Sequence, residues 1–141
     1  MIEKIVYPYD FSKFSEKAIP FIKDFSKLGV KKVIIVSVIE YEELFTHVLF
    51  KESEIRKLKE ETIKRLENLR NDLENAGLET ETVVDFGIPA KIIIKTAKES
   101  KADIIIMGSQ GRGAIMNALL GSTAENVLRR SEIPVLIIPP K

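Results

Sequence analysis

The sequence predicts a single α/β domain spanning residues 1–141, built on one open sheet of parallel strands with helices on both faces. Three observations predict this fold class. The chain of 141 residues has an ordinary length for one domain. Four short runs are almost continuously apolar and rich in β-branched residues, as in strands that are buried on both faces. Segments with helical spacing alternate with these runs, and this order favours parallel strands joined by right-handed crossovers.

Five strands are expected, and they differ in composition. Four are the apolar runs, which leave neither face of the strand for solvent. The remaining segment, residues 80–86, mixes polar with apolar residues, as expected of a strand at the edge of the sheet. In chain order the five segments are residues 4–7, 33–38, 80–86, 103–107 and 135–138.

Four helices are expected between the strands, and glycine or proline marks several of their ends. Gly29 and Gly77 follow two of the apolar stripes, where a left-handed residue commonly ends a helix. Pro89 is well placed as the first residue of the third helix. The longest stripe covers barely three heptads, which favours packing against the sheet over a coiled coil. The helices are expected at residues 14–28, 52–76, 89–98 and 123–130.

Composition excludes several classes of function. Lys and Arg number 22 against 21 Asp and Glu, so the net charge of +1 provides no broad basic surface for nucleic acid. The absence of cysteine excludes disulfides, iron–sulfur clusters, thiolate zinc sites and a cysteine nucleophile. No apolar run is long enough to cross a bilayer, and the N-terminus lacks a basic flank with a long apolar core. We therefore expect a cytoplasmic protein that binds neither nucleic acid nor a membrane.

The segment after the fourth strand is the best candidate for a binding site, because ligands of open α/β sheets lie beyond the carboxyl ends of the strands. Residues 108–113 carry three glycines, which let backbone N–H groups approach an anion closely. Gly121, Ser122 and Thr123 then begin the last helix, whose first amides and dipole favour a phosphate. Ser122 and Glu125 also form a capping-box pattern that needs no ligand, so both interpretations remain open at this point.

Other known sites fit the sequence less well. Residues 108–113 match the outer glycines of a P-loop, but Ala114 stands where its lysine belongs. A receiver domain needs adjacent acidic residues after the first strand, where Asp10 is instead flanked by aromatic residues. The single histidine, His47, has no cysteine in the chain to join it in a metal site. It belongs to the apolar segment 41–50, which either packs over the end of the second strand or covers a ligand or partner.

The spacing of the glycines also resembles that of a known family. Residues 108–122 match, gap for gap, the G-x2-G-x9-G-(S/T) signature of the ATP-binding branch of the universal stress protein family. Residues 8–12 resemble the P-x-D-F/G-S segment of that family, and residues 87–89 resemble its G-x-P segment. Residues 131–138 resemble its closing strand, so the resemblance covers essentially the whole chain.

The resemblance implies a Rossmann-like fold of the adenine nucleotide alpha-hydrolase type, with the strand order 3-2-1-4-5 and ATP bound across the first and fourth strands. ADP or AMP would occupy the same site. Asp10 would lie near the ribose or near a phosphate-bound Mg²⁺, a cation that carboxylate oxygens suit. Val38 would contact the adenine through its backbone. The residues implied to contact the nucleotide are Pro8, Tyr9, Asp10, Val38, Met107, Gly108, Ser109, Gly111, Arg112, Gly113, Gly121, Ser122 and Thr123.

Two further expectations concern activity and assembly. No evident general base or water-positioning residue accompanies the candidate site, so we expect a nucleotide-responsive binding module rather than an enzyme. Slow Mg²⁺-dependent hydrolysis of ATP and a nucleotide-free or AMP-sensing scaffold are the alternatives. The last strand, Val135–Ile138, would be an apolar edge without a guarding charge. Pairing with a second copy would cover this edge, which predicts a homodimer.

Overall fold

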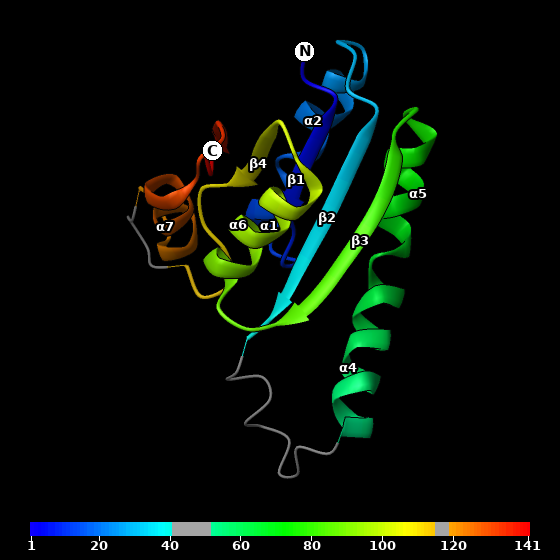
Figure 1. The fold of residues 1–141 in the computed structure, drawn as a ribbon, viewed down its shortest axis with the longest axis vertical. Helices are drawn as coiled ribbons and strands as arrows, with labels where there is room; N and C mark the ends of the chain where they lie inside the picture. Colours follow the sequence, from blue (N-terminus) through cyan, green and yellow to red (C-terminus); the bar gives the residue numbers. More distant parts are fainter. Residues whose placement is uncertain (41–51, 115–118) are drawn as a thin grey trace.

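The structure is a computed structural model that describes residues 1–40, 52–114 and 119–141 (Figure 1). Strands and helices alternate along the chain, as the apolar runs predict. The segment 41–50, with His47, lies outside the described residues, so the expectations about it stay untested. The five strands are β1 (Lys4–Pro8), β2 (Lys32–Ile39), β3 (Glu79–Phe86), β4 (Ile104–Gly108) and β5 (Val135–Ile138).

All five strands are parallel and form one sheet in the order β3-β2-β1-β4-β5. This is the order that the resemblance implies, and β3 lies at an edge as its mixed composition predicts. β2 and β3 are in register along their whole length. β1 and β4, in contrast, are in register only at Ile5 with Ile104 and at Val6 with Ile105. The two central strands therefore separate before their carboxyl ends, at the point where the strand order reverses.

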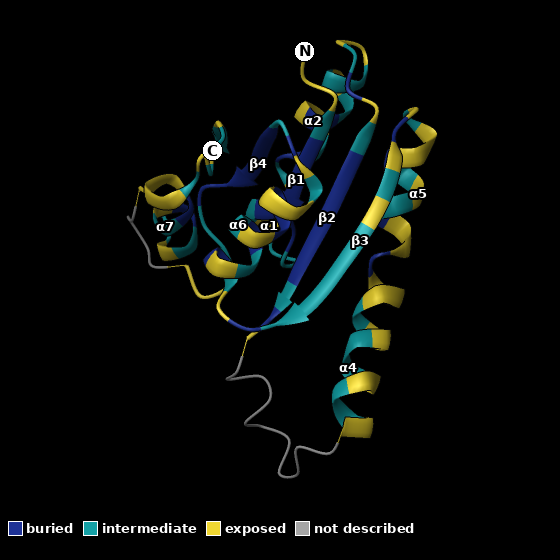
Figure 2. Ribbon diagram, viewed as in Figure 1, coloured by how far each residue is buried: buried dark blue, intermediate teal, exposed yellow. Residues whose placement is uncertain are grey.

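Helices cover both faces of the sheet. The described helices are α1 (Lys13–Glu16), α2 (Ile19–Ser26), α4 (Glu52–Arg65), α5 (Glu67–Asn75), α6 (Pro89–Ser100) and α7 (Ser122–Arg130). Alternate residues of a strand point to opposite faces, so Tyr7 of β1 packs with Ile22 of α2 and Leu73 of α5. Val6 points the other way and packs with Ile93 of α6. Figure 2 shows β2 as a mostly buried strand and α4 as a mostly exposed helix.

The segment predicted as one helix over residues 14–28 forms two helices, α1 and α2. Pro20 stands in the first turn of α2, the position where a helix tolerates a residue without an N–H group. Ile22 is buried as expected, but Leu28 is 72% exposed and lies beyond the end of α2. Gly29 has a left-handed conformation, with φ of +105°, as predicted for the residue that ends this helical segment.

The segment predicted as one long helix over residues 52–76 is divided at Leu66 into α4 and α5. The Leu66 N–H is shared between two carbonyl groups of the preceding turn, and its side chain is fully buried. The stripe packs on the sheet through Leu66, Leu69 and Leu73, which all lie at or after the division. α4 has no buried residue, because it continues past the carboxyl end of β3 (Figure 1).

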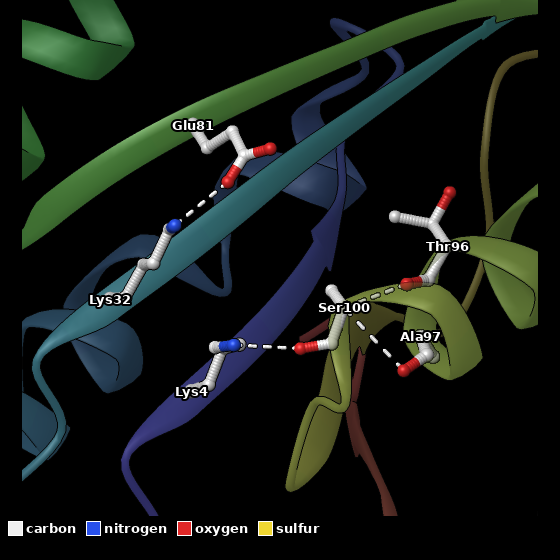
Figure 3. A network of polar contacts seen from close by, with 6 residues as sticks. All are labelled: Lys4, Lys32, Glu81, Thr96, Ala97 and Ser100. Atoms are coloured by element: carbon white, nitrogen blue, oxygen red, sulfur yellow. Dashed lines mark hydrogen bonds and ion pairs between the residues drawn. The ribbon is translucent and has the colours of Figure 1, made fainter.

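Polar contacts close the amino-terminal end of the sheet (Figure 3). The Lys4 ammonium group donates to the backbone carbonyl of Ser100, with Nζ and O 2.7 Å apart. The Lys32 ammonium group pairs with the Glu81 carboxylate at 2.8 Å and connects β2 to β3. The Asp103 carboxylate accepts the Lys4 N–H at 3.0 Å. In the part of the chain that the structure describes, no helix has the length and apolar character needed to span a membrane.

Candidate functional site

A cavity of about 690 Å³ opens at the carboxyl ends of β1, β2 and β4, where the two central strands separate. It is bounded by the glycine-rich segment after β4 and by the first turns of α6 and α7. Every residue implied to contact the nucleotide lines this cavity except Ser109. The lining residues outside that implied set are Ser15, Val36, Glu40, Pro89, Ile93, Gln110, Ala114, Leu120 and Ala124.

Some of these additional residues carry a signal in the sequence. Val36 and Glu40 stand two residues before and two residues after Val38, and an extended chain repeats its orientation every second residue. Pro89 and Ile93 are four residues apart, a spacing that places them on one face of α6. The spacing along the second strand and the third predicted helix could therefore have added these four residues to the predicted site. No comparable signal marks the remaining residues.

Ser109 differs from the other candidate residues in where it points. Its side chain is 2% exposed and is absent from the cavity lining. Its Oγ atom has no hydrogen-bond partner among the described residues. Its backbone N–H donates to Ile138 O at 3.0 Å, and its carbonyl accepts the Gly121 N–H at 2.7 Å. Ser109 therefore ties β4 to β5 and to the start of α7 through its backbone.

The Asp10 carboxylate connects the end of β1 to the glycine-rich segment. Its Oδ1 atom accepts the Ser12 N–H at 3.0 Å, and its Oδ2 atom accepts the Arg112 N–H at 2.9 Å. Burial raises the pKa of Asp10, but hydrogen bonds from Ser12, Arg112 and Ser15 outweigh this effect and hold the pKa below its ordinary value. Asp10 is therefore an anion at neutral pH and brings a negative charge to the cavity.

Three glycines of the family signature lie at close approaches within the chain itself. A Cβ atom on Gly108 would lie 2.6 Å from the backbone carbonyl oxygen of Phe14, so this glycine lets α1 approach β4. A Cβ atom on Gly111 would collide with Oδ2 of Asp10. A Cβ atom on Gly121 would lie 3.1 Å from Cα of Gln110. These glycines therefore draw α1, Asp10 and α7 together around the cavity.

The start of α7 reaches the cavity without a side-chain cap. Gly121 is the N-cap residue, and no side chain bonds to the first amides of the helix. Glu125 does not close a capping box, because its carboxylate accepts from Arg129 Nη2 at 2.8 Å. The sequence leaves open whether Ser122 and Glu125 form a capping box or leave the helix start free for a ligand. The structure shows no capping box. The positive end of the α7 dipole and its first amides remain available to an anion.

The cavity is lined by both apolar side chains and polar groups. Val36 and Val38 of β2 line it together with Ile93 of α6, and the glycine-rich segment and the start of α7 line it as well. The charged lining residues, among those the structure describes, are Asp10, Glu40 and Arg112. Within residues 1–40, 52–114 and 119–141, no group of three or more His, Asp or Glu side chains could hold a metal ion. Asp10 and Glu40 are the described lining carboxylates, so a metal here would take its other ligands from a bound molecule, the backbone or water.

The chain is similar to known proteins over nearly its full length. A family model described as the Universal stress protein family matches residues 1–139. Universal stress protein MJ0577 of Methanocaldococcus jannaschii is 36% identical over an alignment of 157 positions. The alignment covers 100% of this chain and 97% of that protein. The solved structure of MJ0577 has a TM-score of 0.91 with this chain at 38% identity, covering 100% of this chain and 98% of MJ0577.

Two other solved structures share the fold. The structure of the protein PH0823 has a TM-score of 0.82 at 34% identity, covering 98% of this chain and 95% of that one. A universal stress protein solved in complex with cAMP has a TM-score of 0.66 at 25% identity, covering 99% of this chain and 98% of that one. Since the family match runs from the first residue through β5 and the signature glycines surround one cavity, the chain belongs to the universal stress protein family.

Proposed function

We propose that this universal stress protein binds ATP, or the related nucleotides ADP and AMP, in the cavity between β1 and β4. The observation that carries the proposal is the meeting of two phosphate-binding elements at one cavity: the glycine-rich segment 108–113 and the uncapped start of α7. The cavity volume falls within the range of about 300–1,000 Å³ that is typical of small-molecule sites. A nucleotide, with its flat base and anionic tail, suits a cavity that offers both apolar side chains and backbone amides.

The adenine would lie on the β2 side of the cavity. Val36, Val38 and Ile93 supply apolar surface there, and the backbone of Val38 offers polar groups to the edge of the base. The relative solved in complex with cAMP supports an adenine nucleotide as the ligand class. The phosphates would then face the amides of Gly111 and Gly113 and the first turn of α7.

Asp10 gives the phosphate side a requirement for a cation. An ionised carboxylate beside a bare triphosphate is repulsive, and a Mg²⁺ ion between them removes this repulsion. Mg²⁺ commonly binds one or two carboxylates, keeps several waters and completes its shell with phosphate oxygens. A site that draws on the Asp10 carboxylate fits this pattern, and the ion would supply charge neutralisation to the bound phosphates.

We infer a binding module rather than an enzyme. Both oxygens of Asp10 accept hydrogen bonds and its pKa is low, which makes it a weak general base. Among the described lining residues, the other charged side chains are Glu40 and Arg112. Slow Mg²⁺-dependent hydrolysis of ATP is the second candidate, because Asp10 faces the region where the phosphates would lie.

The proposal is tested by mass analysis of material released when freshly purified protein is denatured, followed by titration with ATP, with and without Mg²⁺. We expect an adenine nucleotide to be released or to bind, and Mg²⁺ to tighten the binding of ATP. Failure to bind ATP, ADP and AMP at about 1 mM would contradict the proposal. Phosphate release that Asp10→Ala abolishes, with ATP still bound, would favour the hydrolase.

We also propose a homodimer formed through β5. This strand lies at the edge of the sheet, and Val135, Leu136 and Ile137 are only half-buried in the single chain. The carbonyl groups of Pro134 and Ile138 accept from amides of β4 and of the residue after it. In a parallel ladder the alternate residues, Val135 and Ile137, then turn their backbone groups to the open edge. Pairing with β5 of a second copy about a two-fold axis would satisfy these groups.

A further inference from the structure

The residue after Asp10 has an unusual backbone conformation. Phe11 has φ of +67°, in the left-handed region that aromatic residues rarely adopt. Among the described residues other than glycine, Lys101 alone shares a positive φ with Phe11. Lys101 ends α6 at the opposite end of the sheet. Such a conformation persists when the surrounding structure holds it in place. The contacts of Phe11 show what holds it.

The turn at Phe11 sets the direction of the Asp10 carboxylate. It lets the Ser12 N–H donate to Asp10 Oδ1, two residues earlier in the chain, with N and Oδ1 3.0 Å apart. Asp10 Oδ2 is then 2.9 Å from the Arg112 nitrogen in the glycine-rich segment. The same turn places Ser12 as the N-cap of α1, where its Oγ accepts the Ser15 N–H at 3.1 Å. The turn therefore positions one wall of the cavity.

The Phe11 ring is half-buried against the core, and two side chains contact the ring itself. The Tyr9 ring packs edge-to-face against it, with centroids 5.0 Å apart and an interplanar angle of 71°. The Arg65 guanidinium carbon lies 3.8 Å from the centroid of the Phe11 ring, within cation–π distance. Tyr9 is itself anchored, because its hydroxyl group donates to the Glu16 carboxylate at 3.1 Å.

Arg65 comes from a distant part of the chain. It is the last residue of α4 and immediately precedes Leu66, whose side chain is fully buried at the division between α4 and α5. The backbone of Arg65 is therefore fixed by the core, while α4 itself has no buried residue. The stack of Arg65 on Phe11 connects the end of this surface helix to the turn that carries Asp10.

We infer that Phe11 and Arg65 are positioning residues for the nucleotide site: Arg65, stacked on the Phe11 ring, holds the turn after β1 in the conformation that presents the Asp10 carboxylate to the glycine-rich segment. The inference rests on the proposed function for its ligand, but the geometry it concerns exists in the ligand-free protein. Loss of this stack would then weaken binding of the nucleotide through Phe11.

The first test uses the ligand-free protein. In an amide ¹H–¹⁵N spectrum of the full chain, Asp10→Ala defines how the Ser12 and Arg112 resonances move when the carboxylate is removed. We expect Arg65→Ala to move both resonances in the same direction, and Arg65→Lys, which keeps a cation over the ring, to leave them near their original positions. Lys59→Ala is the matched control, because Lys59 also belongs to α4 and lies over a ring, that of Phe86 in β3.

Two substitutions of Phe11 separate the ring from the backbone. Phe11→Ala and Phe11→Gly both remove the ring, but only glycine adopts a positive φ without strain. We expect the Arg112 resonance of Phe11→Gly to lie closer to that of the unmodified protein than the resonance of Phe11→Ala. If Phe11→Ala fails to fold, the Arg65 variants decide the matter. Unchanged Ser12 and Arg112 resonances in Arg65→Ala would overturn the inference.

The second test measures binding of ATP with Mg²⁺. A solvent-accessible cation–π contact suggests a loss of affinity of about two- to fivefold in Arg65→Ala. The same substitution should have no effect when Asp10→Ala is already present, because the two residues act through one path. An equal loss in both backgrounds would assign Arg65 a general stabilising role and overturn the inference. If the unmodified protein binds no nucleotide, the proposed function fails, and the spectra still decide whether Arg65 positions Asp10.

Discussion

The Asp10 carboxylate and the Arg112 backbone N–H are 102 residues apart in the chain and are joined by a hydrogen bond of 2.9 Å. The bond spans the gap between β1 and β4, beyond the level at which these strands are in register. Asp10 is thus both the candidate contact for Mg²⁺ and the connection between the two sides of the site. Its ionisation should therefore affect the stability of the protein as well as its ligand.

Acid should weaken the folded state through Asp10. Burial raises the pKa of this group, but hydrogen bonds outweigh burial, so its pKa is lower in the folded than in the unfolded protein. The carboxylate therefore stabilises the folded state above the unfolded-state pKa of about 3.9, and this stabilisation is lost as the pH falls through the lower folded-state pKa. Urea unfolding from neutral to acidic pH measures the effect. Asp10→Asn should give a shallower fall of the unfolding free energy below about pH 4, and identical slopes would contradict the prediction.

Substitutions of two signature glycines should separate binding from folding. The added side chain of Gly111→Val meets the end of a flexible carboxylate at Asp10, so the fold should survive while the cavity is blocked. The Cβ atom of Gly108→Ala meets the Phe14 backbone at 2.6 Å, which cannot move aside cheaply. We expect the second variant to lose about 1–3 kcal/mol of unfolding free energy. Thermal unfolding and ATP titration of both variants check these expectations. If Gly111→Val still binds ATP, residues 108–113 do not contact the phosphates and serve only as a turn.

Removal of the Ser122 hydroxyl group should affect the ligand more than the helix. Ser122 follows the N-cap residue and makes no capping bond, so Ser122→Ala should change stability by less than about 0.5 kcal/mol. Loss of a genuine N-cap would cost about 1 kcal/mol instead. Titration with ATP should show weaker binding, by about tenfold or less, if the hydroxyl donates to a phosphate. Glu125→Gln, which disturbs the pair with Arg129, is the control that should leave affinity unchanged.

The open edge of β5 should decide the oligomeric state. Light scattering at micromolar concentration should give twice the chain mass of 15.9 kDa. Ile137→Pro removes an N–H group that faces the edge and should give the single-chain mass. Circular dichroism of the variant shows whether the domain stays folded. A single-chain mass for the unmodified protein would contradict the dimer.

The strands β1, β2 and β4 could be predicted from the sequence because their apolar runs are buried on both faces. Each predicted strand agrees with the structure to within one residue at either end. The divisions of the helices were not predicted. At Leu66 the apolar spacing continues across the division, and only packing on the sheet reveals the change. At Pro20 the proline itself is a local signal of a helix start, which the apolar spacing does not use.

The candidate site could be predicted where glycine spacing and strand ends mark it, but not in its full extent. Spacing cannot tell which way a loop side chain points, so Ser109 was grouped with residues that face the cavity although its side chain is buried elsewhere. The proposed positioning of Asp10 depends on the contact between Arg65 and Phe11. These two residues are 54 positions apart in the chain, so no local pattern encodes their contact.

The short pairing of β1 with β4 divides the sheet into two blocks, β3-β2-β1 and β4-β5. Their shared seam lies toward the amino ends of the strands, and the cavity lies at the end farthest from it. A molecule that touches both blocks there would bridge them at the open end of this gap. Nucleotides with one or three phosphates differ in length, so they would bridge the two blocks to different extents.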